Sequence, residues 1–150
     1  MSEKIYSTSL SQIVELTKDS FTSISEYLFG LSEFDALKLS LSFEEIKAAH
    51  TKYRALISKL LQNIDAMDAD MAKLTRAISA LEHERNILKA RQLSTVFEAY
   101  LIWKKAVNDF VSKCDNIFIN KGERYKLSLN VLYARTLIAA TEQFISALTK

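Results

Sequence analysis

Apolar residues recur in alternating steps of three and four along residues 42–91, a stretch that contains neither Gly nor Pro. We call the positions of this pattern the seam; they are Ile46, His50, Tyr53, Ile57, Leu60, Ile64, Met67, Met71, Leu74, Ile78, Leu81, Arg85 and Leu88. Only His50 and Arg85 are not apolar. A 3.5-residue period kept for about six heptads is typical of a coiled coil or a long bundle helix. At about 1.5 Å per residue, the seam would be roughly 64 Å long.

The start of this helix carries a capping signature. Ser42 precedes Glu45 by three positions, which predicts that each side chain accepts a hydrogen bond from the other residue's backbone N–H. Leu41 and Ile46 are placed to close over the first turn as a hydrophobic staple.

One region inside the helix could break it. Residues 63–70 hold one Asn and three Asp, which are poor helix formers. A break there would give two shorter helices and a squatter bundle. Because the seam crosses this region without losing phase, we expect one continuous helix over 42–91.

The phase is lost after Leu88. The next apolar stripe consists of Leu93, Val96, Tyr100, Trp103, Val107, Phe110 and Cys114. Thr95 and Glu98 are spaced as a second capping pair, which predicts a turn at 91–95 and a new helix over 95–114. A single rod that continues through this point is the alternative.

A first helix is predicted over 10–29, with Ser9 as its cap and Gly30 at its C-terminal end. The connector 31–41 is open between a short helix from Ser32 to Leu39 and an extended segment.

The region 116–129 also allows two structures. Apolar residues alternate on both sides of the turn signal at 120–122, which is compatible with a small β-hairpin. A lone hairpin is only marginally stable, so we favour a helix–loop–helix with Gly122 at the break and a last helix over 123–148.

These elements predict an all-α fold, a single domain over 1–150. We expect an elongated antiparallel bundle of four main helices around one long coiled-coil-like helix. The composition agrees, because two Gly and no Pro are too few for turn-rich β folds. Parallel pairing of the long helix would bring Arg85 against Arg85, so its neighbours should be antiparallel. An Arg85→Leu change should then be neutral or stabilising and should loosen assembly specificity.

Charge and cysteine content add a few constraints. The net charge is +2, but residues 1–84 carry nine basic and thirteen acidic residues, whereas residues 85–150 carry eleven and five. The halves therefore have net charges of −4 and +6, which is either chance variation or a sign of an anionic partner. One cysteine, no secretory signal pattern and no long apolar run indicate a soluble, cytoplasmic protein without a membrane span.

The sequence contains no motif that is typical of catalysis or cofactor binding. His83 lies between two Glu, but neighbours in a helix point in different directions and cannot converge on a metal. The Asp residues at 65–70 lack the Gly and the distant Glu of a calcium loop. The two Gly residues stand alone, so no phosphate-binding loop is present. We expect no enzyme activity, metal or cofactor.

The predicted function is that of a non-enzymatic interaction protein, which would be an adaptor, inhibitor or assembly subunit. It would act through an exposed helix face on another protein or on itself, as an antiparallel homo-oligomer. His50 and Arg85 are candidate partner-binding residues, because polar seam positions can set register and partner. The competing interpretation is a partly buried, hydrogen-bonded His50 and an Arg85 whose charged end reaches solvent.

The alternative function is binding of nucleic acid or another polyanion by the basic C-terminal half. Its candidate residues are Lys104, Lys105, Lys113, Lys121, Arg124 and Lys126. Aromatic residues in the same helix, among them Tyr100 and Trp103, could form a stacking platform for bases, although their place on the stripe favours core packing.

Overall fold

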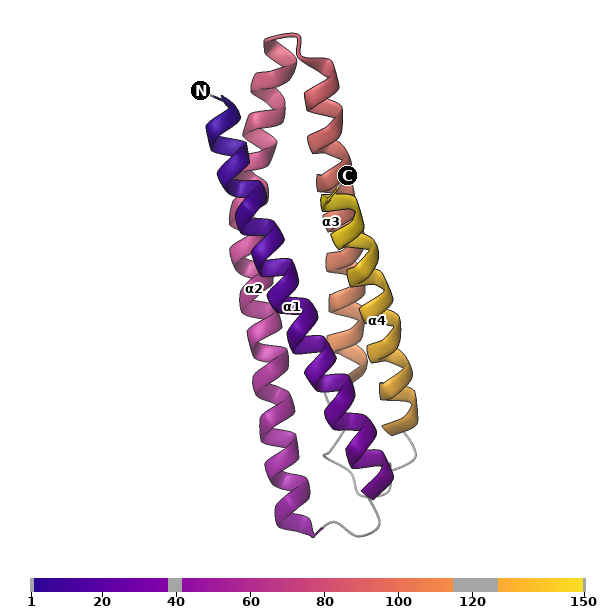
Figure 1. Ribbon diagram of the computed structural model, residues 1–150. Helices are drawn as coiled ribbons and strands as arrows, with labels where there is room; N and C mark the ends of the chain where they lie inside the picture. Colours follow the sequence, from indigo (N-terminus) through magenta and orange to yellow (C-terminus); the bar gives the residue numbers. More distant parts are fainter. Residues whose placement is uncertain (1, 38–41, 115–126, 150) are drawn as a thin grey trace.

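The described part of the protein is an all-α bundle of four helices. The computed structural model describes residues 2–37, 42–114 and 127–149, and no strand occurs in these ranges. The helices are α1 (Ser2–Leu37), α2 (Phe43–His83), α3 (Ile87–Cys114) and α4 (Leu127–Leu148). They run alternately down and up one long axis (Figure 1), so the predicted antiparallel bundle is confirmed. Each helix packs along two neighbours, and within the described ranges the backbones of α1 and α3 lie at diagonal corners. These two helices meet through the rings of Tyr27 and Phe110, whose centroids are 5.3 Å apart in an edge-to-face arrangement.

The long helix α2 is continuous over its 41 residues. Its capping box is present: the Glu45 N–H donates to Ser42 Oγ at 3.2 Å, and the Ser42 N–H to Glu45 Oε1 at 3.5 Å. The expected continuity through 63–70 is also confirmed, and several of its poor helix formers make tertiary contacts that offset their low propensity. The side chains of the staple, Leu41 and Ile46, lie outside the described residues.

The turn between α2 and α3 lies at residues 84–86, so the predicted turn at 91–95 and the predicted end of the helix at 91 are wrong. The Asn86 N–H donates to the Leu81 carbonyl at 2.8 Å and the Arg85 N–H to the Glu82 carbonyl at 3.0 Å. This pair of bonds is a Schellman motif, which satisfies the last carbonyls of α2. Arg85 is its left-handed residue, with φ 63°.

Asn86 then starts α3. Its side-chain Oδ1 accepts a hydrogen bond from the Lys89 N–H at 3.4 Å, as an N-cap does. Thr95 is not a cap: it lies inside α3, where its hydroxyl donates to the Arg91 carbonyl at 2.9 Å. The predicted helix 95–114 therefore begins eight residues too late, because a local capping pair cannot show where the preceding helix folds back.

The first helix is longer than the predicted 10–29. It runs through Ser9 and Gly30, so neither residue ends it. The ring of Tyr53 packs on Gly30, and a Cβ at this glycine would come within 2.6 Å of the ring carbon Cε1. Gly30 is therefore a site of close helix packing and not a helix end. Residues 32–37 are helical, and residues 38–41 of the connector lie outside the described part.

The last helix begins at Leu127 in the described part of the chain. Residues 127–129 are helical, so they do not form the second strand of a hairpin. The remaining residues of the hairpin alternative, and positions 123–126 of the predicted last helix, lie outside the described ranges.

The core follows the predicted stripes. Most seam residues between Tyr53 and Leu81 are buried, as is the α3 stripe from Leu93 to Phe110. Polar contacts between neighbouring helices fix their register. Examples from three helix pairs are the Asn63 amide donating to Asp19 (2.8 Å, α2 to α1), the Lys104 ammonium on Asp68 (2.9 Å, α3 to α2) and the Trp103 indole donating to Thr141 (2.8 Å, α3 to α4).

Candidate interaction surface

Large apolar side chains are exposed on the outer side of α3, in two pairs about 21 Å apart along the helix. Among the described residues, six large hydrophobic side chains are exposed, and four of these belong to α3. They are Ile87 (48% exposed), Leu88 (70%), Leu101 (49%) and Ile102 (72%); the other two are Phe29 on α1 and Leu132 on α4. Single exposed apolar residues are ordinary on a protein surface. Four on one helix, outside the core stripe, are the strongest surface signal in this fold.

The outer side of α3 has its own helical pattern. We call Leu88, Arg91, Thr95, Glu98 and Ile102 the outer stripe; all five are exposed. Their spacing of three, four, three and four places them in one line along the helix. The core stripe buries another side of α3, so the outer stripe lies outside the core.

The charges of the outer stripe are unpaired in the described part of the chain. The residues three and four positions from Arg91 are Ile, Leu, Ser and Thr, and those around Glu98 are of the same four types. Neither charge therefore has an oppositely charged neighbour on its own helix. The two ion pairs that bind helices together involve other residues, namely Lys59 with Asp19 and Lys104 with Asp68. Two opposite charges, one heptad apart and flanked by apolar residues, are therefore available to a partner.

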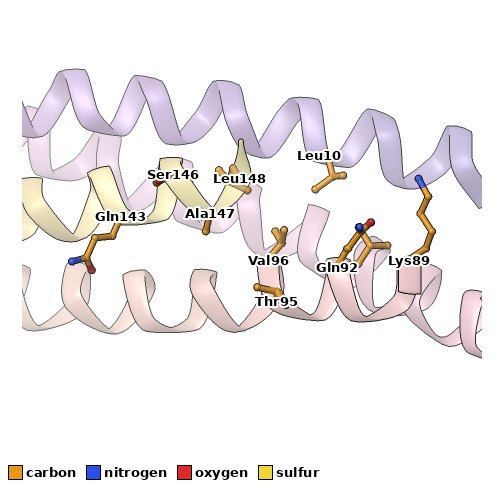
Figure 2. A pocket seen from close by; sticks show the side chains of 10 residues that line it. Leu10, Lys89, Gln92, Thr95, Val96, Gln143, Ser146, Ala147 and Leu148 are labelled. Atoms are coloured by element: carbon orange, nitrogen blue, oxygen red, sulfur yellow. The ribbon is translucent and has the colours of Figure 1, made fainter. Parts of the chain in front are cut away.

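A cavity of about 550 Å³ opens beside this stripe, where α4 ends. Figure 1 shows that α4 stops well short of the α2–α3 turn. Side chains of α1, α3 and α4 line the cavity (Figure 2): Leu10, Lys89, Gln92, Leu93, Thr95, Val96, Gln143, Ser146, Ala147 and Leu148. Its lining is mainly apolar and amide, with Lys89 as its one charged side chain. Thr95 belongs to both the cavity and the outer stripe.

Several titratable groups have a shifted pKa, and burial or hydrogen bonding within the fold causes each shift. Burial, and then the hydrogen bond of 2.5 Å to Asp68, raise the pKa of the Tyr100 phenol well above its usual range. The hydrogen bond from Asn63 lowers the pKa of Asp19. Burial raises the pKa of Asp70. The hydrogen bonds of Tyr100 to Asp68 and of Asn63 to Asp19 each join two neighbouring helices.

The predicted partner-binding residues are not brought together. Arg85 is exposed in the turn and is not a seam residue, so its predicted place in the core is wrong; Leu88, the next seam position, is also exposed. His50 lies in α2 at a seam position, but its side chain is outside the described part. The effect predicted for Arg85→Leu rested on the seam and loses that basis.

Three of the basic residues of the alternative function lie in the described part of the chain, and each has a different environment. Lys104 is engaged with Asp68, Lys113 stands 4.9 Å from the centre of the Tyr133 ring, and Lys105 is exposed. Lys121, Arg124 and Lys126 lie outside the described residues. Polyanion binding thus stays a prediction. The aromatic residues Tyr100 and Trp103 are only 1% exposed, so they pack in the core and are not a stacking platform.

The outer stripe itself was not predicted from the sequence. Leu88 was assigned to the seam, which obscured its relation to Ile102. The signal is nevertheless present, because a second three-and-four pattern runs beside the core stripe between these two residues. It becomes visible only once the true start of α3 at Ile87 is known.

Comparison of the chain with protein-family models, with curated proteins and with solved structures finds no match. Among residues 2–37, 42–114 and 127–149, no cluster of three His, Cys, Asp or Glu side chains could hold a metal ion. None of the helices in these ranges combines the length and the apolar character that a membrane crossing requires.

Proposed function

We propose that the protein is a non-enzymatic interaction protein, an assembly subunit or adaptor, that binds a helical partner through the outer stripe of α3. The observation that carries this proposal is the concentration of four of the six exposed large apolar side chains of the described chain on this one helix.

The surface suits recognition of a helix by a helix. A partner helix with an apolar face can cover Leu88 and Ile102, and covering a large apolar side chain contributes roughly 1.5 to 3 kcal/mol. The core stripe and the hydrogen bond from Trp103 to Thr141 hold α3 in place. The helix therefore loses little conformational entropy when the partner binds. Arg91 and Glu98 between the apolar residues give the partner a preferred direction.

Site-specific photocrosslinking tests the proposal. A benzophenone amino acid replaces Ile102 in one sample and Leu132, the exposed leucine of α4, in the matched control. Both are irradiated in an extract of cells that express the chain. We expect discrete protein adducts, including any adduct with a second copy, from position 102 but not from position 132.

A competition experiment tests whether the adducts form through the outer stripe. An excess of the unmodified chain should suppress the adducts at position 102, whereas the Ile102→Glu chain should not, because its outer stripe no longer binds. Equal labelling from positions 102 and 132, or no adduct from position 102, contradicts the proposed function.

A further inference from the structure

We infer that the outer stripe binds the outer stripe of a second copy of this chain, in an antiparallel pair whose two-fold axis passes next to Thr95. This inference rests on the proposed function and names its partner. It requires only residues of the described surface.

The stripe has the same chemistry when it is followed in either direction. From its N-terminal end it presents an apolar residue, a charge, a small polar residue, a charge and an apolar residue. The two charges are opposite, Arg91 on one side of Thr95 and Glu98 on the other. A two-fold axis at the centre therefore places unlike charges together and apolar residues together.

The register can be worked out from the helix rise. A two-fold axis at Thr95 sets residue 88 of one copy level with residue 102 of the other, so Leu88 meets Ile102 twice. It sets Arg91 level with position 99 of the second copy, one residue or about 1.5 Å from Glu98. The long arginine side chain spans this offset, so two symmetric ion pairs form at the centre of the contact.

A parallel arrangement is disfavoured by the same residues. It would place Arg91 beside Arg91 and Glu98 beside Glu98, and like charges in an interface oppose association. The small Thr95 at the axis lets the helices approach closely. On one side Thr95 lines the cavity (Figure 2).

The contact is short. On α3 it extends from Ile87 to position 103, about 25 Å at 1.5 Å per residue, because the helix begins at Ile87. A surface of this length is at the lower end of specific interfaces, so the dimer should be reversible. We therefore expect dimerisation to depend on concentration over about 5 to 500 µM.

Sedimentation equilibrium with charge reversal is the first test. Arg91→Glu or Glu98→Arg alone should raise the dimer dissociation constant about tenfold or more, because each creates two like-charged pairs. The double variant Arg91→Glu/Glu98→Arg should restore dimerisation to near the level of the unchanged chain. Asp109→Lys, on the same helix but beyond the contact, is the matched control and should have no effect.

Disulfide trapping tests the direction, in a Cys114→Ser background. A mixture of Leu88→Cys and Ile102→Cys chains should give mixed disulfide dimers, and Thr95→Cys should give dimers with itself. Ser112→Cys, an exposed position beyond the contact, should remain monomeric. Leu88→Cys or Ile102→Cys dimers formed with themselves as readily as with each other would indicate a parallel pair and overturn the inference.

The outcomes separate this inference from the proposed function. A chain that stays monomeric at 500 µM overturns the self-pairing. If position 102 still gives competed adducts with other proteins, the interaction function stands without it. Loss of both the dimer and the adducts removes the inference and the function together. A dimer that the charge reversals leave unchanged also overturns the inference, because it must use another surface.

Discussion

Arg85 adopts a left-handed backbone conformation with φ 63°, at the position of a Schellman motif where glycine is common. A side chain with a Cβ is strained there, and glycine is not. We expect Arg85→Gly to raise the free energy of unfolding by about 0.5 to 1 kcal/mol. Urea unfolding followed by circular dichroism measures the change. Arg91→Gly, inside α3, should instead lower it by about 1 kcal/mol; if both variants are destabilised, the turn geometry is not as described.

Glycine is also favoured at position 30, but there the reason is close packing and not the backbone conformation. An added Cβ would meet the ring of Tyr53, which is held edge-to-face against Tyr27 at 5.4 Å and cannot move freely. We expect Gly30→Ala to lower the free energy of unfolding by about 1 to 2 kcal/mol, despite the better helix propensity of alanine. In a Tyr53→Leu background the same change should become neutral or stabilising. A stabilising effect with Tyr53 present would show that the ring is not tightly packed.

Asp70 is a buried carboxyl, 8% exposed, one heptad after Asn63 on the side of α2 that faces α1. Burial raises its pKa above the ordinary value of 3.8, and Lys73 offsets this only in part. A raised pKa means that the folded state binds the proton more tightly than the unfolded state. The ionised Asp70 carboxylate therefore lowers the free energy of unfolding at neutral pH, and this loss is removed as the pH falls through the folded pKa.

Asp70→Asn should therefore raise the free energy of unfolding at pH 7 by about 1 kcal/mol, because no charge is buried. The advantage over the unchanged chain should shrink as the pH falls toward 3.8. Parallel urea titrations at several pH values measure this difference. Asp19→Asn is the control of opposite sign, since its pKa is lowered and its charge stabilises the fold above the ordinary value. An advantage of Asp70→Asn that is independent of pH would contradict the assignment.

At the scale of the elements, apolar packing joins the neighbouring helices, and polar contacts join α1 to α2, α2 to α3 and α3 to α4. The network of Lys104, Asp68 and Tyr100 joins α2 to α3 in the middle of the bundle. Asp68 is a poor helix former that stabilises the fold through its contacts across the interface. The seam shows which side of α2 is buried, but the partner of each polar residue depends on where the neighbouring helix lies. This is why Asp68 could be seen only as a weak point before the structure was known.

At the scale of the whole molecule, α2 alone is about 61 Å long, and the proposed dimer overlaps only near one end. The two-fold axis at Thr95 lies about 12 Å from the start of α3. The antiparallel dimer should thus be about 100 Å long, against roughly 60 to 65 Å for the monomer. Small-angle scattering of a concentration series should show the maximum dimension rising between these values, while Arg91→Glu stays near the lower one. Dimerisation without an increase in length would indicate lateral pairing along the full bundle.

The sequence by itself determined the all-α class, the capping box at Ser42, the continuity of α2 and the buried sides of α2 and α3. These properties are local or periodic, because a helical repeat of apolar residues can be buried on only one side. Only the tertiary structure decided that α2 turns back at residues 84–86, that α1 continues through Gly30 and that Leu88 faces solvent. Each depends on contacts between residues distant in the chain or on backbone dihedrals that residue type does not specify, such as the left-handed Arg85 and the ring of Tyr53 on Gly30. The outer stripe became recognisable for the same reason, since its residues form one surface only after the true start of α3 is known.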